Sequence, residues 1–264
     1  MHQIPRDHPR YESLRIRQRL VFGAARGLAA REGLLAHGRG EAFDYLLGEK
    51  TNPEARAASR AAAAALLLAE RPVLSVNGNV ASLVPEEMVR LASAIPGAAI
   101  EVNLFHRTEE RARKIGRELG TAFGKLGKRA RRPRIFAGGP DARLAGLSSD
   151  RSKCHREGML SADVVLVPLE DGDRAGALKR AKKTVLAIDL NPLSRTARTA
   201  DITIVDNIVR ALPELLRQAE SLRGVPRSRL LRLLDGFDND ANLRKAIGRM
   251  LRRLAALSRT RRSS

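Results

Sequence analysis

Residues 184–207, TVLAIDLNPLSRTARTADITIVDN, decide the fold predicted for this chain of 264 residues. Residues 184–188 form a short apolar run, partly β-branched, which is typical of a buried strand. The Asn191-Pro192 pair that follows forces a turn. Residues 202–205 form a second apolar run of the same kind. The stretch therefore predicts two strands of a mainly parallel sheet.

Polar side chains follow both predicted strands. An acid and an amide come after each strand, and an arginine between two hydroxyl residues lies in the connection. Ligands of open α/β sheets bind just beyond the carboxyl ends of the strands. Carboxylates and amides recognise ribose hydroxyls and base edges, whereas arginine and hydroxyl groups hold phosphate. The sequence therefore predicts a nucleotide pocket with the side chains Asp189, Asn191, Ser194, Arg195, Thr196, Asp206 and Asn207.

Strand and helix patterns alternate over the rest of the chain, which predicts an α/β fold with helices on both faces of the sheet. Further strands are expected at residues 72–76, 99–104, 133–136 and 162–168. Helices are expected at residues 9–31, 53–70, 85–95, 109–119, 174–182, 208–222, 227–235 and 240–257. Residues 123–134 are interpreted as a basic connector and residues 147–158 as an irregular segment. We expect one domain over residues 1–258, with helical segments at 9–33 and 208–258 and a basic tail at 259–264.

Residues 36–51 are interpreted as a glycine-flanked ligand loop. Gly38 and Gly40 lie on either side of Arg39, so the backbone can approach a ligand while the guanidinium reaches it. Gly33 is expected to end the preceding helix. The segment lacks the third glycine of a dinucleotide fingerprint and the glycine-rich run of a P-loop. An NAD(P)-dependent oxidoreductase is therefore disfavoured.

Two further polar groups follow predicted strands. The Asn77-Gly78-Asn79 tripeptide is a turn signal at a place where a ligand loop would also lie. Three acids follow the strand expected at 162–168, and they are suited to hold Mg²⁺ or an amine. They are equally suited to cap the next helix, because acids stabilise a helix N-terminus. Both interpretations stay open for Glu170, Asp171 and Asp173.

The net charge of +20 raises the question of nucleic-acid binding. The chain has two Tyr, six Phe and no Trp, so aromatic platforms for single strands are scarce. The basic excess lies mainly in residues 107–134 and 223–262, and we interpret it as a solvated surface that can attract polyphosphate substrates. Nucleic acid is not the expected partner. A non-catalytic nucleotide- or nucleic-acid-binding α/β protein is kept as the alternative.

The cysteine content and the apolar runs bear on the compartment. Cys154 is the single cysteine, so no internal disulfide can form and a reducing compartment fits. The N-terminal residues lack the apolar region of a signal peptide. The longest apolar run, residues 61–69, is far shorter than the roughly 20 residues that span a bilayer. We therefore expect a cytoplasmic protein without a membrane segment.

Several long motifs carry a resemblance to a known family. They are HPRYESL (8–14), HGRGEAFDYLLGEKT (37–51), SVNGNVASLVPEE (75–87), EVNLF (101–105), SADVVLVPLEDGDR (161–174), IDLNPLSRTA (188–197) and ITIVDN (202–207). Together they resemble archaeal phosphopantothenate synthetase, the 4-phosphopantoate–β-alanine ligase of coenzyme A synthesis. The resemblance covers roughly residues 8–245. The basic segment 122–134 and the tail after Leu251 match no part of the family pattern and stay without a role.

The resemblance implies a Rossmann-like homodimer that uses ATP, with Mg²⁺, to adenylate 4-phosphopantoate before β-alanine displaces AMP. Arg39 and Arg195 are implied as the catalytic cations, which neutralise charge at the α-phosphate. The implied ATP contacts are Arg17, Arg39, Asp189, Leu190, Asn191, Arg195, Thr196, Asp206 and Asn207. The implied contacts of the other two substrates are Asn77, Gly78, Asn79, Arg107, Glu170, Asp171 and Asp173. No metal ligand is assigned among them.

Overall fold

The computed structural model describes residues 4–127 and 130–259 and contains a six-stranded, entirely parallel sheet in the order β3-β2-β1-β6-β7-β8. The strands are β1 (Pro72–Val76), β2 (Ala99–Val102), β3 (Arg134–Phe136), β6 (Val164–Pro168), β7 (Thr184–Ile188) and β8 (Ile202–Ile204). The first strand, β1, lies in the middle of the sheet, and β2 and β3 follow on one side of it. The chain then returns to place β6 on the other side of β1, with Leu74 opposite Leu166. This order is that of a Rossmann fold, so the predicted fold class is confirmed, and its switch point lies between β1 and β6.

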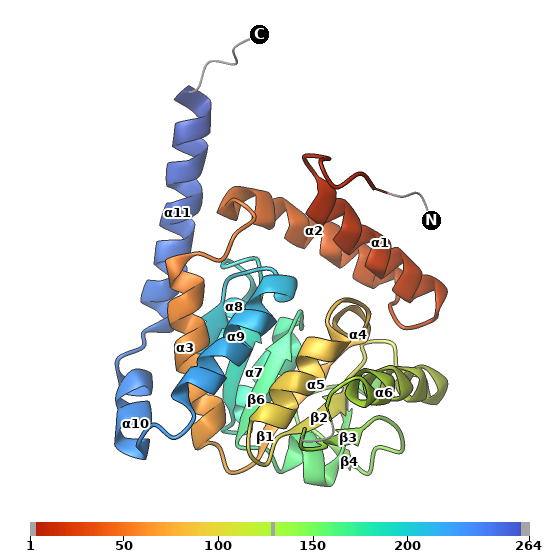
Figure 1. Cartoon of the computed structure of the whole chain (residues 1–264). Coiled ribbons are helices and arrows are strands. Elements are labelled where there is room, and N and C mark those ends of the chain that lie inside the picture. The colour runs from red at the N-terminus through yellow and green to blue at the C-terminus, as the bar shows by residue number, and fades with distance from the viewer. Residues whose placement is uncertain (1–3, 128–129, 260–264) are drawn as a thin grey trace.

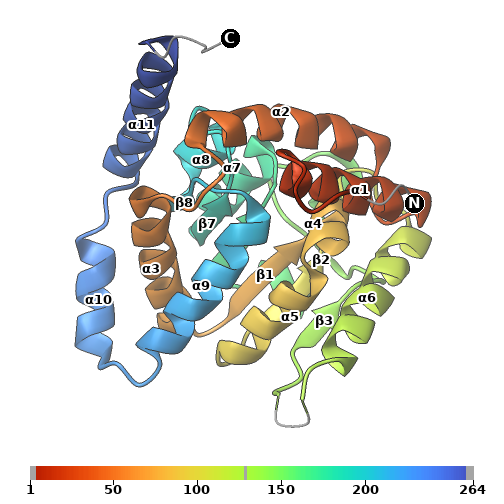
Figure 2. The same cartoon turned by 45° about the horizontal axis from the view of Figure 1, so that its top comes forward.

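Four helices cover one face of the sheet (Figures 1 and 2). They are α3 (Pro53–Leu68), α5 (Pro85–Ala94), α6 (Glu109–Gly124) and α9 (Ile208–Leu222). Their apolar sides share one core with inward side chains of the strands such as Leu74, Ile100 and Leu186. The central residues of α3 are mostly alanines, whose small side chains let this helix pack closely on α9 and the sheet.

The opposite face carries less regular structure. It is covered by α7 (Gly172–Arg180) and by residues 137–162, which include the short pair β4 (Ala142–Arg143) and β5 (Lys153–Cys154). A buried carboxylate, Glu101 of β2, holds this segment by accepting the N–H groups of His155 (3.3 Å) and Met159 (2.6 Å). Burial raises the pKa of the Cys154 thiol to about 11, so this side chain is uncharged and inert at neutral pH.

Helices from both ends of the chain complete the molecule. The helices α1 (Tyr11–Ala25) and α2 (Arg31–Leu47) lie across the end of the sheet at which the strands finish, above α4 (Gly78–Leu83) (Figure 1). The C-terminal helices α10 (Arg227–Asp235) and α11 (Asn239–Arg259) follow α9, and the far end of α11 projects from the body. Among the described residues, no helix has both the length and the apolar character that a bilayer crossing requires.

The glycine-flanked loop predicted around Arg39 is wrong, because this segment is the helix α2. The first helix ends earlier than expected, at Ala25. Gly27 (φ +74°) lies in the turn that follows, where the N–H of Leu28 bonds the carbonyl of Gly23. Gly33, expected as a helix stop, therefore lies inside α2. Glycines in a helix interior cost about 1 kcal/mol each. Gly33 is required by close packing, because a Cβ there would lie 2.3 Å from Asn79 Oδ1, whereas a Cβ on Gly40 would meet Leu190 at an ordinary contact distance of 3.5 Å.

Three other segments differ from the sequence prediction. The Asn77-Gly78-Asn79 tripeptide starts α4 instead of a simple turn, because the Asn77 side chain accepts the N–H groups of Asn79 and Val80. The connection after β7 contains the short helix α8 (Arg195–Thr199). The helix expected at 109–119 runs on to Gly124, into the basic connector. Arg259 of the predicted tail is the last residue of α11, and residues 260–264 lie outside the described residues.

Candidate active site

A pocket of about 590 Å³ lies between α2 and the carboxyl ends of the strands. It is lined from above by Arg39 and its neighbours on α2 and from below by the residues that follow β6, β7 and β8. The predicted residues that the structure brings together in this lining are Arg39, Asn79, Glu170, Asp171, Asp189, Leu190, Asn191, Ser194, Arg195, Thr196 and Asn207. The pocket therefore occupies the place at which Rossmann folds bind their ligands.

The loop after β7 is held in shape by its own side chains. Asp189 accepts the N–H of Asn191 (2.9 Å) and the hydroxyl of Ser194. Ser194 in turn accepts the N–H of Ala197 (2.9 Å), so it caps α8, the helix that carries Arg195. Burial raises the pKa of Asp189, although the hydrogen bonds from Ser194 and Asn191 oppose this shift. This loop presents a preorganised carboxylate to the pocket.

Of the acid and the amide that follow β8, the amide lines the pocket and the acid supports the surrounding structure. Asn207 lines the pocket, caps α9 and donates to Asp44 of α2 at 2.8 Å. Asp206 is only 1% exposed and does not line the pocket. It accepts the Thr51 hydroxyl (2.6 Å) and the Nε–H of Arg210 (2.9 Å) instead. Asp206 thus braces the entry to α3, and an ATP contact by its side chain is not part of this geometry.

The residues after β6 form the acidic wall of the pocket. Burial raises the pKa of Glu170 to about 7, with the guanidinium of Arg174 opposing the shift from 3.2 Å. Asp171 accepts the N–H groups of Asp173 and Arg174, each at 3.0 Å, so its predicted role as a helix cap is confirmed. Asp173 lies outside the pocket and pairs with Arg195 at 2.8 Å.

The three acids do not fit a dedicated metal site. Each one faces an arginine: Glu170 faces Arg174, and both Asp171 and Asp173 face Arg151. Within residues 4–127 and 130–259, no cluster of three or more His, Cys, Asp or Glu side chains is arranged to hold a metal ion. Mg²⁺ binds proteins through few carboxylates and keeps phosphate and water ligands. Any Mg²⁺ at this site is therefore expected to be held mainly by the phosphates of a nucleotide.

The remaining predicted residues lie outside the pocket lining. The Asn77 amide donates to the carbonyls of Pro168 (3.1 Å) and Leu169 (3.0 Å), which ties β1 to β6. A Cβ on Gly78 would lie 2.3 Å from the Leu28 carbonyl, so its role is to let α4 approach the turn between α1 and α2. Arg107 is almost fully buried and donates to the Val102 carbonyl at 2.9 Å. Arg17 pairs with Glu41 at 2.7 Å and lines a separate apolar groove on α1.

His37 is a pocket residue that the sequence prediction missed. It lies on α2, one turn before Gly40, and burial lowers the pKa of its imidazole, which is therefore neutral at pH 7. Its Nε2 is buried and has no hydrogen-bond partner in the described part of the chain. His37, Gly40 and Phe43 are spaced three residues apart, so they share one face of a helix. A helical interpretation of this segment would therefore have placed His37 beside the other two residues.

The lining combines an apolar wall with cations at its rim. Apolar side chains such as Phe43, Leu190 and Ile208 offer a surface for a flat base. Arg39 is exposed and has no hydrogen-bond or ion-pair partner within the described residues, so its guanidinium is available to an anion. This arrangement is suited to bind a nucleotide with its phosphates near Arg39 and Arg195.

The chain is similar in sequence to a known family of enzymes. The sequence model of the family described as phosphopantothenate/pantothenate synthetase matches residues 54–253. The chain is 50% identical over 258 residues to the 4-phosphopantoate–β-alanine ligase of Thermococcus kodakarensis, which covers 98% of this chain and 96% of that protein. It is 48% identical over 258 residues to the enzyme of the same name from Methanosarcina mazei, with 98% of both chains covered. The similarity thus extends over nearly the whole chain.

Proposed function

Because this chain belongs to the phosphopantothenate/pantothenate synthetase family, we propose that it is the ATP-dependent ligase that joins 4-phosphopantoate to β-alanine in coenzyme A synthesis. The product is 4′-phosphopantothenate, and ATP is cleaved to AMP and pyrophosphate. The observation that carries the proposal is the pocket itself, where Arg39 and Arg195 stand at the rim of a lining built from the residues after β6, β7 and β8.

The reaction proceeds through an acyl-adenylate. A carboxylate oxygen of 4-phosphopantoate bonds to the α-phosphorus of ATP, and the bond from that phosphorus to the bridging oxygen breaks, so that pyrophosphate leaves with the electron pair. The uncharged amine of β-alanine then attacks the acyl carbon and AMP departs. Arg39 and Arg195 stabilise the negative charge that develops at the α-phosphate. The pocket contributes by holding the carboxylate in line with ATP.

The nucleotide lies against the apolar wall and the β7 and β8 loops. The preorganised carboxylate of Asp189 accepts donors from ribose or adenine, and the amides of Asn191 and Asn207 recognise polar edges of the same ligand. Thr196 donates its hydroxyl to the Glu170 carbonyl at 2.8 Å, which fixes the two loops relative to each other. Arg17 and Asp206 support this site from outside its lining, through Glu41 and Arg210.

Glu170 is the acid that we assign to the amine of β-alanine. It lines the pocket, its pKa of about 7 lets it accept a proton near neutral pH, and the ammonium must lose a proton before it can attack. Asn79 is the proposed 4-phosphopantoate contact that lines the pocket, and Asn77 and Gly78 position it. Arg107 lies outside the lining and pairs with Glu109 at 3.5 Å, so it is proposed to support the site of that substrate and not to line it.

A homodimer and a cytoplasmic location complete the proposal. Apolar side chains are exposed on α1, with Val21 59% and Phe22 47% exposed, and an apolar groove of about 360 Å³ lies beside them. Such a patch is typical of a protein interface. The lone Cys154 forms no disulfide, which fits a reducing compartment. Light scattering on the purified protein tests the dimer, because a monomer mass would contradict it.

The function is tested by following the products. Purified protein with ATP, 4-phosphopantoate and β-alanine is expected to release AMP and pyrophosphate continuously and in equal amounts. This continuous release is expected to be lost when 4-phosphopantoate or β-alanine is omitted. Formation of ADP and phosphate would reject adenylation while leaving ligation intact. Absence of both reactions, together with RNA binding that persists near 200 mM salt, would favour the alternative of a nucleic-acid-binding protein.

A further inference from the structure

A second cavity lies beside the active-site pocket, and we call it the side chamber. It has a volume of about 350 Å³ and is lined by α1, α2 and the N-terminal ends of α5 and α9. His37 and Asn207 line both the side chamber and the pocket, so the two spaces meet at these side chains. The buried Nε2 of His37 has no hydrogen-bond partner among the residues that the structure describes, so this atom is available to a ligand at the junction.

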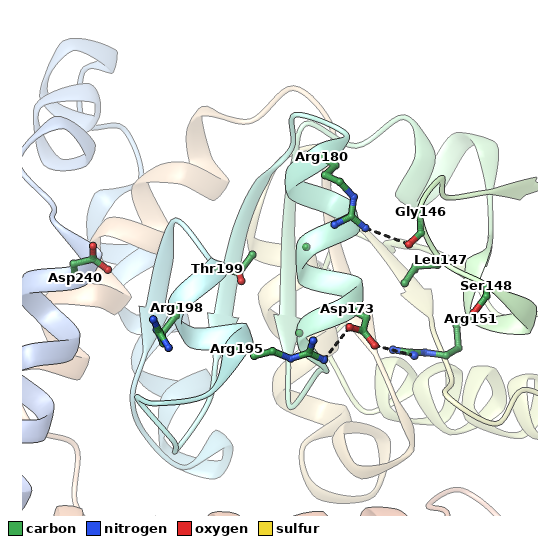
Figure 3. Close-up of a pocket in the computed structure, with 12 residues that line it drawn as sticks. Gly146, Leu147, Ser148, Arg151, Asp173, Arg180, Arg195, Arg198, Thr199 and Asp240 are labelled. Carbon is green, nitrogen blue, oxygen red and sulfur yellow. Dashed lines mark hydrogen bonds and ion pairs between the residues drawn. The ribbon is translucent and has the colours of Figure 1, made fainter.

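The side chamber is lined by charges of both signs, with the acids in excess. Its charged residues are Glu12, Glu41, Asp44, Glu49 and Glu87, together with Arg15, Arg19 and Arg210. A depression over α7 also adjoins the pocket, and it has the opposite balance of charge (Figure 3). Its charged residues are Arg151, Arg180, Arg195 and Arg198, against Asp173 and Asp240. An ammonium group is therefore attracted to the side chamber and repelled from the depression over α7.

The side chamber contains a guanidinium group that the protein itself does not use. Arg15 pairs with Glu12 at 2.7 Å. Arg210 pairs with Asp44. Arg19 of α1 is half-buried and makes no hydrogen bond or ion pair within residues 4–127 and 130–259. Guanidinium groups bind carboxylates through two parallel hydrogen bonds, so Arg19 is available to a carboxylate that enters the side chamber.

Two carboxylates of the side chamber are also available. Glu87 of α5 is half-buried and Glu49, just after α2, is exposed. Neither side chain makes a hydrogen bond or an ion pair with any other described residue. A cavity that offers both a guanidinium group and carboxylates suits a small zwitterion, because the two ends of such a molecule need partners of opposite charge.

We propose that the side chamber takes up β-alanine and delivers its amine to the active-site pocket. The inference rests on the proposed function, which requires an amine beside the acyl-adenylate. Arg19 binds the carboxylate of β-alanine and Glu87 binds its ammonium group. The ammonium then passes His37 and Asn207 into the pocket, where the Glu170 carboxylate takes one proton from it. Burial lowers the pKa of the His37 imidazole, so this side chain carries no charge that would repel the ammonium.

The experiment separates β-alanine binding from adenylation. Arg19→Ala is the test variant, and Arg232→Ala is the matched control, since Arg232 is an exposed arginine of α10 that lines neither cavity. The KM for β-alanine is measured with ATP and 4-phosphopantoate at saturation. Exchange of pyrophosphate into ATP, which needs 4-phosphopantoate but no amine, reports whether the pocket is intact. β-Alaninamide serves as a second amine, because it lacks the carboxylate that Arg19 binds.

We expect Arg19→Ala to raise the KM for β-alanine about tenfold, which is the effect of one charge-assisted contact, and to leave the pyrophosphate exchange unchanged. Its preference for β-alanine over β-alaninamide should fall by the same factor, and Arg232→Ala should behave as the unmodified protein does. An unchanged KM for β-alanine, or equal losses with both amines, would overturn the inference. A loss of pyrophosphate exchange in Arg19→Ala would overturn it too, because Arg19 would then act on adenylation.

Calorimetry with β-alanine alone distinguishes failure of the inference from failure of the proposed function. If the unmodified protein forms no ligation product but binds β-alanine about tenfold more tightly than Arg19→Ala does, the side chamber stands and the proposed function fails. If ligation proceeds and the two proteins have the same KM for β-alanine, the proposed function stands and the side chamber fails.

Discussion

Arg210 is the side chain on which we expect the joint between α2 and α9 to depend. It lies between two carboxylates, at 2.9 Å from Asp206 through Nε and 3.2 Å from Asp44 through Nη1, with further contacts through Nη2. The side chains of Asp206 and Asp44 are 1% and 7% exposed. Arg210→Met removes the cation but keeps much of the volume, so two nearly buried negative charges would face each other without compensation.

The expected loss of stability is about 3–5 kcal/mol, the usual cost of removing one partner from a buried ion pair. For a chain of this size, that corresponds to a fall in Tm of roughly 6–20 °C. Urea unfolding at pH 7, followed by circular dichroism, measures the free energy directly. Because Asp44 is on α2 with Arg39, turnover should fall as well. Arg15→Met is the control, since Arg15 pairs with Glu12 on an exposed surface, with side chains 46% and 63% exposed, and its removal should leave stability unchanged.

The pH dependence of the stability lost in Arg210→Met is a sharper test. Burial already raises the pKa of Asp206, and removing Arg210 takes away the charge that opposes the shift. The folded variant then binds a proton more readily than the unfolded chain, so its free energy of unfolding rises as the pH falls through that raised pKa. The deficit relative to the unmodified protein should therefore shrink between pH 7 and pH 5. A loss below about 1 kcal/mol, or a deficit that is the same at both pH values, would refute the reasoning.

Three further expectations concern catalysis. Arg39→Ala should lower kcat by about two to three orders of magnitude, because its guanidinium stabilises negative charge at the α-phosphate. The Tm should stay unchanged, because this exposed side chain makes no contact that stabilises the fold. Steady-state rates and a thermal melt measure the two effects. Asp189→Ala should raise the KM for ATP more than that for 4-phosphopantoate, and equal changes would remove Asp189 from the nucleotide site. The aminolysis step should accelerate about tenfold from pH 6 to pH 8 as Glu170 loses its proton near pH 7. Glu170→Gln should slow this step and remove the inflection near pH 7, leaving only the steady rise that follows the free amine of β-alanine. Exchange of pyrophosphate into ATP needs no amine, so its rate should not change when Glu170 is replaced.

The sequence alone predicted those strands and helices whose pattern of apolar residues is uninterrupted. Three elements lie where the sequence predicted them: the strand Thr184–Ile188 and the helices Ile208–Leu222 and Arg227–Asp235. Apolar runs and amphipathic spacing indicate such elements without any knowledge of the segments against which they pack. The helix Arg31–Leu47 was missed because its glycines oppose helix formation locally. Distant contacts stabilise it, among them the bond between Asp44 and Asn207.

The same distinction applies to the candidate site. Residues after buried strands were placed at one edge because the parallel sheet brings its strand ends together, whatever the details of packing. The direction of a side chain depends on partners elsewhere in the chain. Asp206 turns from the pocket towards Thr51 and Arg210, and Asp173 pairs with Arg151 and Arg195 outside the pocket. No periodicity or motif in the sequence encodes those pairings.

The amide of Asn77 joins the two halves of the sheet, and it belongs to an Asn-Gly pair, which is chemically the least durable setting for an asparagine. Hydrolysis of this amide would replace an NH₂ group by a carboxylate that faces the carbonyl oxygens of Pro168 and Leu169. The attraction that now ties β1 to β6 would become repulsion. The same hydrogen bonds hold the Asn77 side chain in place, so the fold that depends on this amide also protects it.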